Sequence, residues 1–270
     1  MIHRWSEGAA DQNMPESILV ELGAAVRAHP WWRARAEFTL ALMETMALPE
    51  APRVLDVGCG WGVTLEALER RGHRVEGLDI SRRALDQLDR PDRTLIEADL
   101  ARPVPDGAAR YDAVLALDVI EHIDDDRDAV QKLACLTKPG GAVIVSVPAL
   151  PDLYSEFDEV QGHRRRYMPD TLRAVFAGSG LVVERDLWWG AWMVPVVRHQ
   201  RRRPSRRDPE VSADAAYLSY LRLPPWPFPS LMMAAYRLER RKALRGRLRT
   251  GTSLFAIARR TVPSSGSAPA

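Results

Sequence analysis

The chain is poor in the residues and segments that cross-link a protein or anchor it in a membrane. Its two cysteines, Cys59 and Cys135, are too few for a disulfide framework, which predicts reduced thiols. The first residues are polar and lack the apolar core of a signal peptide. The longest apolar runs, around 187–197 and 231–236, are shorter than the roughly twenty residues that cross a bilayer. We therefore expect a cytoplasmic protein without a membrane span.

Lysine and net charge are scarce as well. The only lysines are Lys132, Lys138 and Lys242, and the formal net charge is +2 at pH 7. The whole molecule is therefore not a polycation. A hydrophobic content of 46% and a charged content of 27% are typical of a globular domain. The 270 residues suffice for one α/β domain with additions.

Strand-like and helical patterns alternate through most of the chain. Strands are expected near 53–57, 74–78, 94–97, 112–117, 142–147, 181–188 and 252–259, and helices near 62–71, 82–89, 126–137 and 170–178. Such alternation predicts a mostly parallel sheet with right-handed crossovers and helices on both faces. The fold class is therefore α/β, with a sheet of seven strands.

Five parts are predicted along the chain. Residues 1–50 form an N-terminal helical cap, in which His29-Pro30 breaks a helical pattern that runs from Ile18 to Met46. Residues 51–190 form the core, and residues 251–260 add its last strand. Between them, residues 191–250 form a basic, proline-rich helical insertion with an arginine run at Arg198–Arg207 and a basic helix near 230–247. Residues 261–270 are a disordered tail.

The most informative stretch is a glycine-rich turn after a buried strand. An acid lies before the turn, a second acid follows the next strand, and the glycines alternate: Asp56, Gly58, Gly60, Gly62 and Asp79. Dinucleotide-binding turns read G-x-G-x-x-G and aim a helix at a pyrophosphate, whereas this turn reads G-x-G-x-G and no phosphate-binding Lys or Arg follows it. The sequence predicts a cationic or zwitterionic ligand with a ribose and no phosphate. S-adenosylmethionine meets that description.

The same stretch resembles class I S-adenosylmethionine-dependent methyltransferases, and the likeness continues in order along the chain. Asp79, followed by Ile80, is similar to the acid that binds the ribose hydroxyls, and Asp99-Leu100 to the acid on the adenine side. Residues 111–118 resemble the fourth strand, and 138–141 the turn into the fifth. The resemblance implies a Rossmann-like sheet whose last strand is antiparallel, with ligands at the carboxyl ends of the strands. Its implied cofactor set is Arg35, Asp56, Gly58, Cys59, Gly60, Asp79, Ile80, Asp99, Leu100 and Asp118.

Two further motifs are similar to those of a large bacterial methyltransferase group linked to glycan and natural-product pathways. Residues 29–35 resemble H-x-W-F/W-x-x-R, and residues 157–167 resemble FD-x-x-x-GH-x-RRY. Arg35 then becomes a candidate partner of the cofactor carboxylate, because a guanidinium grips a carboxylate in a fork. The alternative is a surface arginine. Trp31 and Trp32 either line the pocket or, as the favoured interpretation, pack in the core.

His163 is the candidate catalytic base. It follows the fifth strand, and histidine is the side chain whose ordinary pKa lies near neutrality. Asp158 or Glu159 could orient His163 or act in its place, and Tyr167 could position substrate or pack. The alternative is a structural loop clamped by residues 164–166.

A metal-assisted mechanism is the less favoured alternative. Asp118, Glu121 and His122, with His163 across the cleft, resemble the E-x-x-E-H set of metal-dependent O-methyltransferases that act on catechols or RNA riboses. The first position here is Asp rather than Glu. Relatives without a metal carry the same residues, so no metal ligand is assigned, and a divalent ion is kept only as an alternative cofactor.

The predicted function is methyl transfer from S-adenosylmethionine to a hydroxyl or amine of a small molecule, either a secondary metabolite or a glycan precursor. The alternatives are a metal-assisted RNA or catechol O-methyltransferase and a non-methylating relative that binds the cofactor. The Arg198–Arg207 run could contact an anionic lipid or membrane surface, or be simply solvated. Nucleic acid is the weaker partner, and the sequence predicts no oligomeric state.

Overall fold

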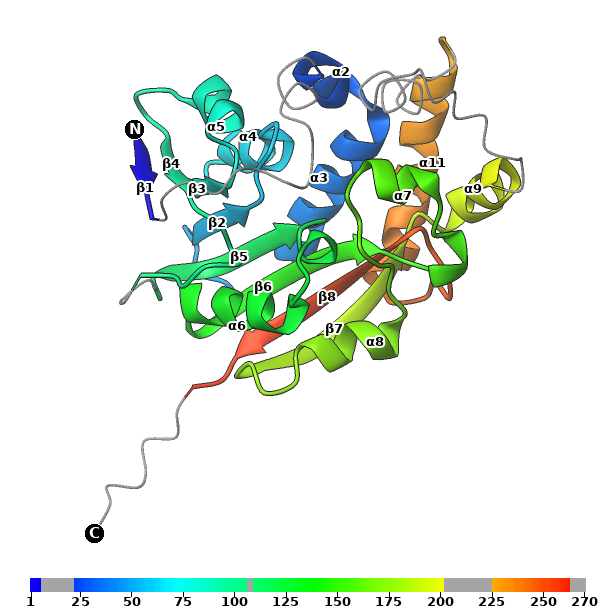
Figure 1. Cartoon of the computed structure of the whole chain (residues 1–270). Coiled ribbons are helices and arrows are strands. Elements are labelled where there is room, and N and C mark those ends of the chain that lie inside the picture. Colours follow the sequence, from blue (N-terminus) through cyan, green and yellow to red (C-terminus); the bar gives the residue numbers. More distant parts are fainter. Residues whose placement is uncertain (6–21, 106–108, 202–224, 263–270) are drawn as a thin grey trace.

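A single twisted sheet organises the molecule. The computed structural model describes residues 1–5, 22–105, 109–201 and 225–262. The sheet has eight strands in the order β1-β4-β3-β2-β5-β6-β8-β7 (Figure 1). Their bounds are β1 Ile2–Arg4, β2 Arg53–Val57, β3 Arg74–Asp79, β4 Thr94–Glu97, β5 Tyr111–Leu117, β6 Thr137–Pro148, β7 Leu181–Trp189 and β8 Ser253–Arg260.

The strand directions agree with the mostly parallel sheet that the alternating pattern predicts. The neighbours from β1 to β6 are all parallel, whereas β8 is antiparallel to both β6 and β7. The central strands are continuous apolar runs, because both faces of a parallel sheet are covered. The prediction of an α/β fold with a Rossmann-like, mostly parallel sheet and an antiparallel last strand is confirmed.

The prediction of seven strands is wrong by one. The additional strand, β1, pairs with β4 at the sheet edge, with Ile2 opposite Leu95. It is held by the backbone, since the Trp5 N–H donates to the Glu97 carbonyl at 2.9 Å, and by an ion pair between Arg4 and Glu97 at 2.8 Å. A strand of three residues is too short to show a period-two pattern, so no pattern in the sequence indicates β1.

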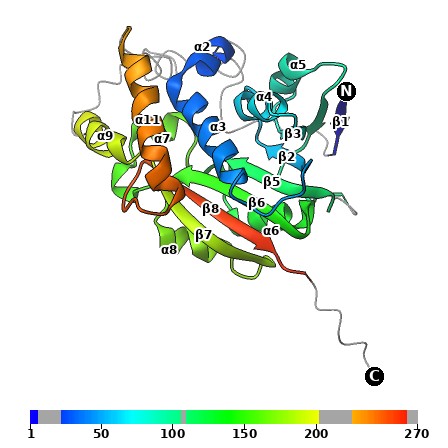
Figure 2. The same cartoon turned by 180° about the vertical axis from the view of Figure 1, so that it is seen from behind.

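Helices cover both faces of the sheet. On one face lie α3 Pro30–Met43, α4 Val63–Glu69, α5 Arg82–Leu88 and α11 Phe228–Leu244, and on the other lie α6 Asp126–Leu136 and α8 Pro169–Val175. Figures 1 and 2 show the two layers from opposite sides. The short helices α2 Gly23–Ala28, α7 Glu156–Val160 and α9 Val194–Arg201 lie at one end of the sheet. None of the helices in the described ranges has the length and apolar character that crossing a bilayer requires.

Local sequence signals set several helix ends. His29-Pro30 separates α2 from α3 as predicted: Pro30 occupies the first helical position, and the Trp31 N–H donates to His29 Nδ1 at 3.1 Å. Ser81 caps α5 by accepting from the Ala84 N–H at 3.3 Å. Residues 18–21 of the predicted first helix lie outside the described ranges.

The segment between β7 and β8 is described in part. It contains a short 3-10 helix, Ala191–Met193, followed by α9 and α11. Residues 202–224 lie outside the described ranges, and so do residues 263–270 of the predicted tail. The helical insertion as a whole, and the five-part division of the chain, therefore stay predictions.

Candidate active site

The glycine turn follows β2 at the carboxyl end of the sheet. Gly58, Gly60 and Gly62 have φ of 67°, 46° and 74°, a left-handed conformation that favours glycine. A Cβ on Gly58 would lie 2.5 Å from Val119 Cγ2, so glycine is required there for close approach as well. The Gly58 and Cys59 N–H groups donate to the Leu78 carbonyl at 2.7 and 3.1 Å. Cys59 is buried beneath the turn.

Asp79 ends β3 and is bound to the glycine turn. Its carboxylate accepts from the Gly60 N–H at 2.7 Å and from the Ser81 N–H at 2.9 Å. The Asp79 carbonyl accepts from the Ala98 N–H at 3.0 Å, which brings the segment after β4 to the same edge. Ile80, directly after it, is half-buried.

Asp56 is buried at the end of β2. Burial raises the pKa of its carboxyl to about 7, the nearby Asp79 raises the pKa further, and the Arg35 guanidinium opposes the rise. Asp56, Asp79 and Arg35 therefore share one electrostatic environment. The structure brings these three predicted cofactor residues together.

Asp99 and Leu100 reach the edge less directly. The Asp99 carboxylate accepts from the Ala101 N–H at 2.8 Å and lies 3.7 Å from Arg102 Nε. These contacts are therefore with the turn that directly follows Asp99. Leu100 is buried in the core on the α6 face.

Arg35 and Asp118 form an ion pair with each other. Asp118 has φ of 57°, a conformation that is uncommon for residues other than glycine, and accepts from Ser146 Oγ at 3.1 Å. Arg35 Nε is buried and has no hydrogen-bond partner in the described part of the chain. The guanidinium carbon of Arg35 lies 4.8 Å from the centre of a Trp31 ring. Arg35, which the sequence assigned to the cofactor carboxylate, thus binds a protein carboxylate through Nη1, while its Nε has no partner among the described residues.

His163 is held by a buried carboxylate. Its Nδ1 lies 3.1 Å from Asp158 Oδ1. Asp158 also accepts from the Ser155 N–H at 3.0 Å, from Arg166 Nε at 2.7 Å and from Arg201 Nη1 at 2.9 Å. Burial alone would raise the pKa of Asp158, but the hydrogen bond from His163 and the two guanidiniums hold it well below its usual range. Asp158 therefore remains ionised and is fitted to orient His163, and the alternative in which Asp158 itself is the base is disfavoured.

A second carboxyl faces the other side of His163. Glu121 Oε1 lies 4.0 Å from His163 Nε2. Glu121 is fully buried, and neither of its carboxyl oxygens has a hydrogen-bond partner among the described residues. Burial, with Asp118 adding to it, raises the pKa of Glu121 well above its ordinary value, so burial favours the protonated form of this carboxyl.

His122 completes this cluster. Its ring centre lies 4.8 Å from that of His163, and its buried Nδ1 has no partner in the described chain. Burial lowers the pKa of His122 to about 4, so the imidazole is neutral. Ligand atoms of Glu121, His122 and His163 lie within 4.8 Å of one another. Asp118, the fourth residue of the metal alternative, is bound to Arg35 instead.

Tyr167 has its hydroxyl bound to a residue outside this cluster. Its ring is buried in the core, and its hydroxyl donates to Asp126 Oδ2 at 2.8 Å. Burial, together with Asp126, raises its pKa well above the ordinary value. This placement favours packing over substrate positioning.

Sequence reasoning missed two residues that shape the site, Ser146 and Arg201, and named a third, Arg166, only as part of the alternative clamp at 164–166. Arg166 and Arg201 neutralise Asp158, and Ser146 holds Asp118. Ser146 had a signal, because it is the single polar residue in the buried run Val143–Val147. Arg166 belongs to the R-R-R-Y motif, whereas Arg201 carries no spacing signal.

Comparisons with known proteins agree on the family. A family profile described as "Methyltransferase domain" matches residues 31–202. A ubiquinone biosynthesis O-methyltransferase of Paracidovorax citrulli is 32% identical over 135 residues, covering 44% of this chain and 57% of that protein. Its Alkalilimnicola ehrlichii counterpart is 40% identical over 104 residues, covering 36% and 42%. The chain thus spans about half the length of these curated relatives.

Solved structures show the same fold. A Haemonchus contortus phosphoethanolamine N-methyltransferase in complex with S-adenosyl-L-methionine has a TM-score of 0.56 at 14% identity, covering 96% of this chain and 62% of that one. The [4+2]-cyclase SpnF has a TM-score of 0.54 at 17% identity, covering 97% and 87%. At such identities the likeness concerns the fold alone. The glycine turn, the sheet order and the profile match together show that the chain belongs to the methyltransferase domain family and has the fold of S-adenosylmethionine-dependent methyltransferases.

Proposed function

We propose that this protein transfers a methyl group from S-adenosylmethionine to a hydroxyl or amine of a small molecule. The observation that carries the proposal is His163, placed between an ionised Asp158 on Nδ1 and a buried Glu121 near Nε2. The relatives named ubiquinone biosynthesis O-methyltransferase favour a hydroxyl over an amine. A secondary metabolite or a glycan precursor is the proposed acceptor class.

The residues at the carboxyl edge fit the cofactor. A Cβ on Gly60 would approach only the Gly58 carbonyl, at 3.9 Å, so this face of the turn is open to a ligand. Asp79 beside it offers carboxylate oxygens suited to ribose hydroxyls. Arg35, with its unpaired Nε, and Asp56 carry charges suited to a zwitterionic tail.

The cofactor, when bound, supplies a methyl group already activated by a positive sulfur. The remaining work belongs to the protein: it must hold the acceptor in line and exclude water. Asp158 keeps the proton of His163 on Nδ1, which leaves Nε2 free to accept the proton of an acceptor hydroxyl. The same logic orients a histidine base through a carboxylate in other enzymes.

The test is the pair His163→Ala and His73→Ala, the latter changing a half-buried histidine in the turn before β3. Binding of S-adenosylhomocysteine is measured by calorimetry, and turnover is measured with a panel of phenols, sugar nucleotides and amines. We expect His163→Ala to lose on the order of 10²-fold or more in kcat with unchanged nucleoside affinity, and His73→Ala to behave as wild type. Unchanged turnover of His163→Ala would show that His163 is not the catalytic base. Binding without S-adenosylhomocysteine formation on any acceptor would favour a non-methylating relative.

A metal-assisted reaction is the second candidate, because Glu121, His122 and His163 have convergent ligand atoms and two of these residues carry unpaired buried ligand atoms. A divalent ion there would bind and acidify an acceptor hydroxyl. Loss of activity in a chelator, restored by Mg²⁺ or Mn²⁺, would support it. Chelator-insensitive turnover would exclude it.

A further inference from the structure

The outer face of α11 combines exposed apolar side chains with basic ones. Leu231 and Leu238 are 60% and 80% exposed, and because they are seven residues apart they lie on one side of the helix. Ala234 and Ala235 lie between them. Trp226, 82% exposed, and Phe228 extend the apolar surface before and into the first turn. Side chains of this size are normally turned inward when a helix packs on a sheet.

The same line of the helix continues with cations. Arg241, Lys242 and Arg245 follow Leu238 at steps of three, four and seven residues, and all three are exposed. The only acid of α11 is Glu239, which points inward and accepts from the Gly190 N–H at 2.6 Å. The outer face therefore has apolar and basic side chains and no carboxylate.

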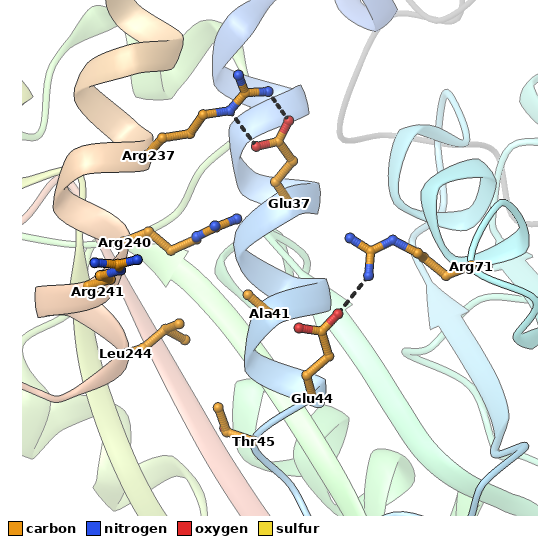
Figure 3. Close-up of a pocket in the computed structure, with 9 residues that line it drawn as sticks. All are labelled: Glu37, Ala41, Glu44, Thr45, Arg71, Arg237, Arg240, Arg241 and Leu244. Atoms are coloured by element: carbon orange, nitrogen blue, oxygen red, sulfur yellow. Dashed lines mark hydrogen bonds and ion pairs between the residues drawn. The ribbon is translucent and has the colours of Figure 1, made fainter.

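A basic groove runs along the adjoining side of α11. It lies between α3, α11 and the end of α4, with a volume of about 560 Å³ (Figure 3). Arg237 is paired with Glu37 at 2.8 Å, and Arg71 with Glu44 at 2.6 Å. Two more guanidiniums line it, from Arg240 and Arg241, and neither has a hydrogen bond or ion pair within the described part of the chain. Four cations against two carboxylates leave the groove positive.

The arginine run that begins at Arg198 does not present unpaired cations beside an exposed apolar face in its described part. Arg198 is paired with Asp152 at 3.0 Å, and Arg201 with Asp158 at 2.9 Å. These arginines hold α9 against the loop that carries His163. Residues 202–207 of that run lie outside the described ranges.

The geometry points to α11 as a helix that docks this protein on an anionic lipid bilayer. Leu231, Leu238 and Trp226 enter the interface between headgroups and acyl chains. Arg241, Lys242 and Arg245 meet anionic headgroups, and the groove receives lipid phosphate. An apolar face with flanking cations and no acid is the composition of interfacial helices. Nucleic acid fits less well, because exposed leucines give nothing to a phosphate backbone.

Flotation of the full chain with lipid vesicles tests the inference. We expect binding to phosphatidylcholine vesicles with about one third phosphatidylglycerol, and little binding to phosphatidylcholine alone, because each basic residue near an anionic surface gives about a fivefold gain in affinity. Binding should weaken strongly between about 0.1 M and 1 M salt. Inorganic phosphate at the same ionic strength should not displace the protein. Displacement would identify a soluble anion site and overturn the lipid assignment.

Two variants separate the apolar and basic contributions. Leu231→Ser with Leu238→Ser should weaken vesicle binding by about tenfold or more, and Arg241→Gln with Lys242→Gln and Arg245→Gln by about a hundredfold. The matched controls are Val182→Ser, on the edge strand β7 and 56% exposed, and Arg70→Gln with Arg74→Gln and Arg127→Gln, three exposed arginines elsewhere. Both controls should bind as wild type.

Other outcomes would overturn the proposal. Equal binding to neutral and anionic vesicles, or wild-type binding by both α11 variants, would show that this face does not meet lipid. A dimer in sedimentation that the leucine variant dissociates would show that a second copy covers the face. RNA binding abolished by the basic variant in the absence of vesicle binding would assign the cations to nucleic acid. Unchanged S-adenosylhomocysteine affinity in every variant confirms that folding is intact.

Discussion

Asp158→Asn is the substitution that tests the site most directly. The Asp158 carboxylate is fully buried and accepts from four donors, two of them guanidiniums. Removing one partner of a buried ion pair leaves an uncompensated charge and costs about 3–5 kcal/mol. The Arg201 side chain is 16% exposed and can turn toward water once its partner is lost, whereas the Arg166 side chain, at 6%, stays buried. Only one of the two guanidiniums is then left as an uncompensated buried charge. We therefore expect a loss near the lower limit, about 3 kcal/mol.

The assay is urea unfolding of wild type and variant, measured first at neutral pH and then repeated at lower pH values. The pKa of Asp158 lies below its ordinary 3.8, so its contribution to the free energy of unfolding is complete above that value and disappears as pH falls through the depressed pKa. The difference between wild type and variant should therefore be full at pH 7 and shrink below about pH 4. The control is Asp124→Asn, which changes an 80% exposed carboxylate paired with Arg164 and should cost less than about 1 kcal/mol.

The same variant separates orientation from stability. An Asn at position 158 keeps an acceptor oxygen but no charge, so the proton on His163 Nδ1 is no longer fixed. We expect at least a tenfold loss of kcat with unchanged S-adenosylhomocysteine affinity at temperatures where the variant is folded. A loss of stability below about 1 kcal/mol, together with wild-type turnover, would refute the role given to Asp158.

Three further predictions follow from neighbouring residues. Gly58→Ala should lower the free energy of unfolding in urea by about 2–4 kcal/mol and abolish nucleoside binding, because its Cβ would lie 2.5 Å from Val119. The control is Gly72→Ala, which has a positive φ but open space around it. It should lower the free energy of unfolding by only about 1–2 kcal/mol. The affinity for S-adenosylmethionine should rise from pH 6 to pH 8, because the pKa of Asp56 is about 7 and its ionised form attracts a cation; calorimetry of Asp56→Asn should show a flat profile. Glu121→Gln should change the free energy of unfolding by less than about 1 kcal/mol, because Gln resembles a protonated Glu; a loss above about 2 kcal/mol would show that Glu121 is ionised.

The core strands were predictable because their apolar runs are bounded by turns. β2 and β4 coincide with the predicted ranges, and β3 and β5 differ by one residue. β6 begins five residues earlier than predicted, at Thr137. Thr137 pairs with Tyr111 and Ala142 with Ala113, so the residues between them leave the ladder. The K-P-G-G sequence, which reads as a turn, lies where the register between β5 and β6 shifts, within the bounds of β6.

The candidate site was predictable where it depends on short separations. His163 and Asp158 are five residues apart, and the end of α7 with the turn at Gly162 brings them together. Arg201 is 43 residues from Asp158, and Arg35 is 83 residues from Asp118. Such pairs depend on how α9 and α3 pack against the sheet, which no local pattern encodes. The burial that raises the pKa of Glu121 likewise results from tertiary packing, which the local sequence does not encode.

A continuous set of contacts joins α11 to the candidate base. Glu239 on α11 accepts from the backbone N–H groups of residues 190–192, directly before α9. Arg201, the last residue of α9, donates to Asp158, and Asp158 holds His163. Both links are hydrogen bonds with a charged partner and are stronger than neutral ones. These hydrogen bonds connect α11, through α9, to the carboxylate that holds His163. For this reason we regard α9 and α11 as part of the scaffold of the site, although they lie between the last two strands and outside the repeating α/β core.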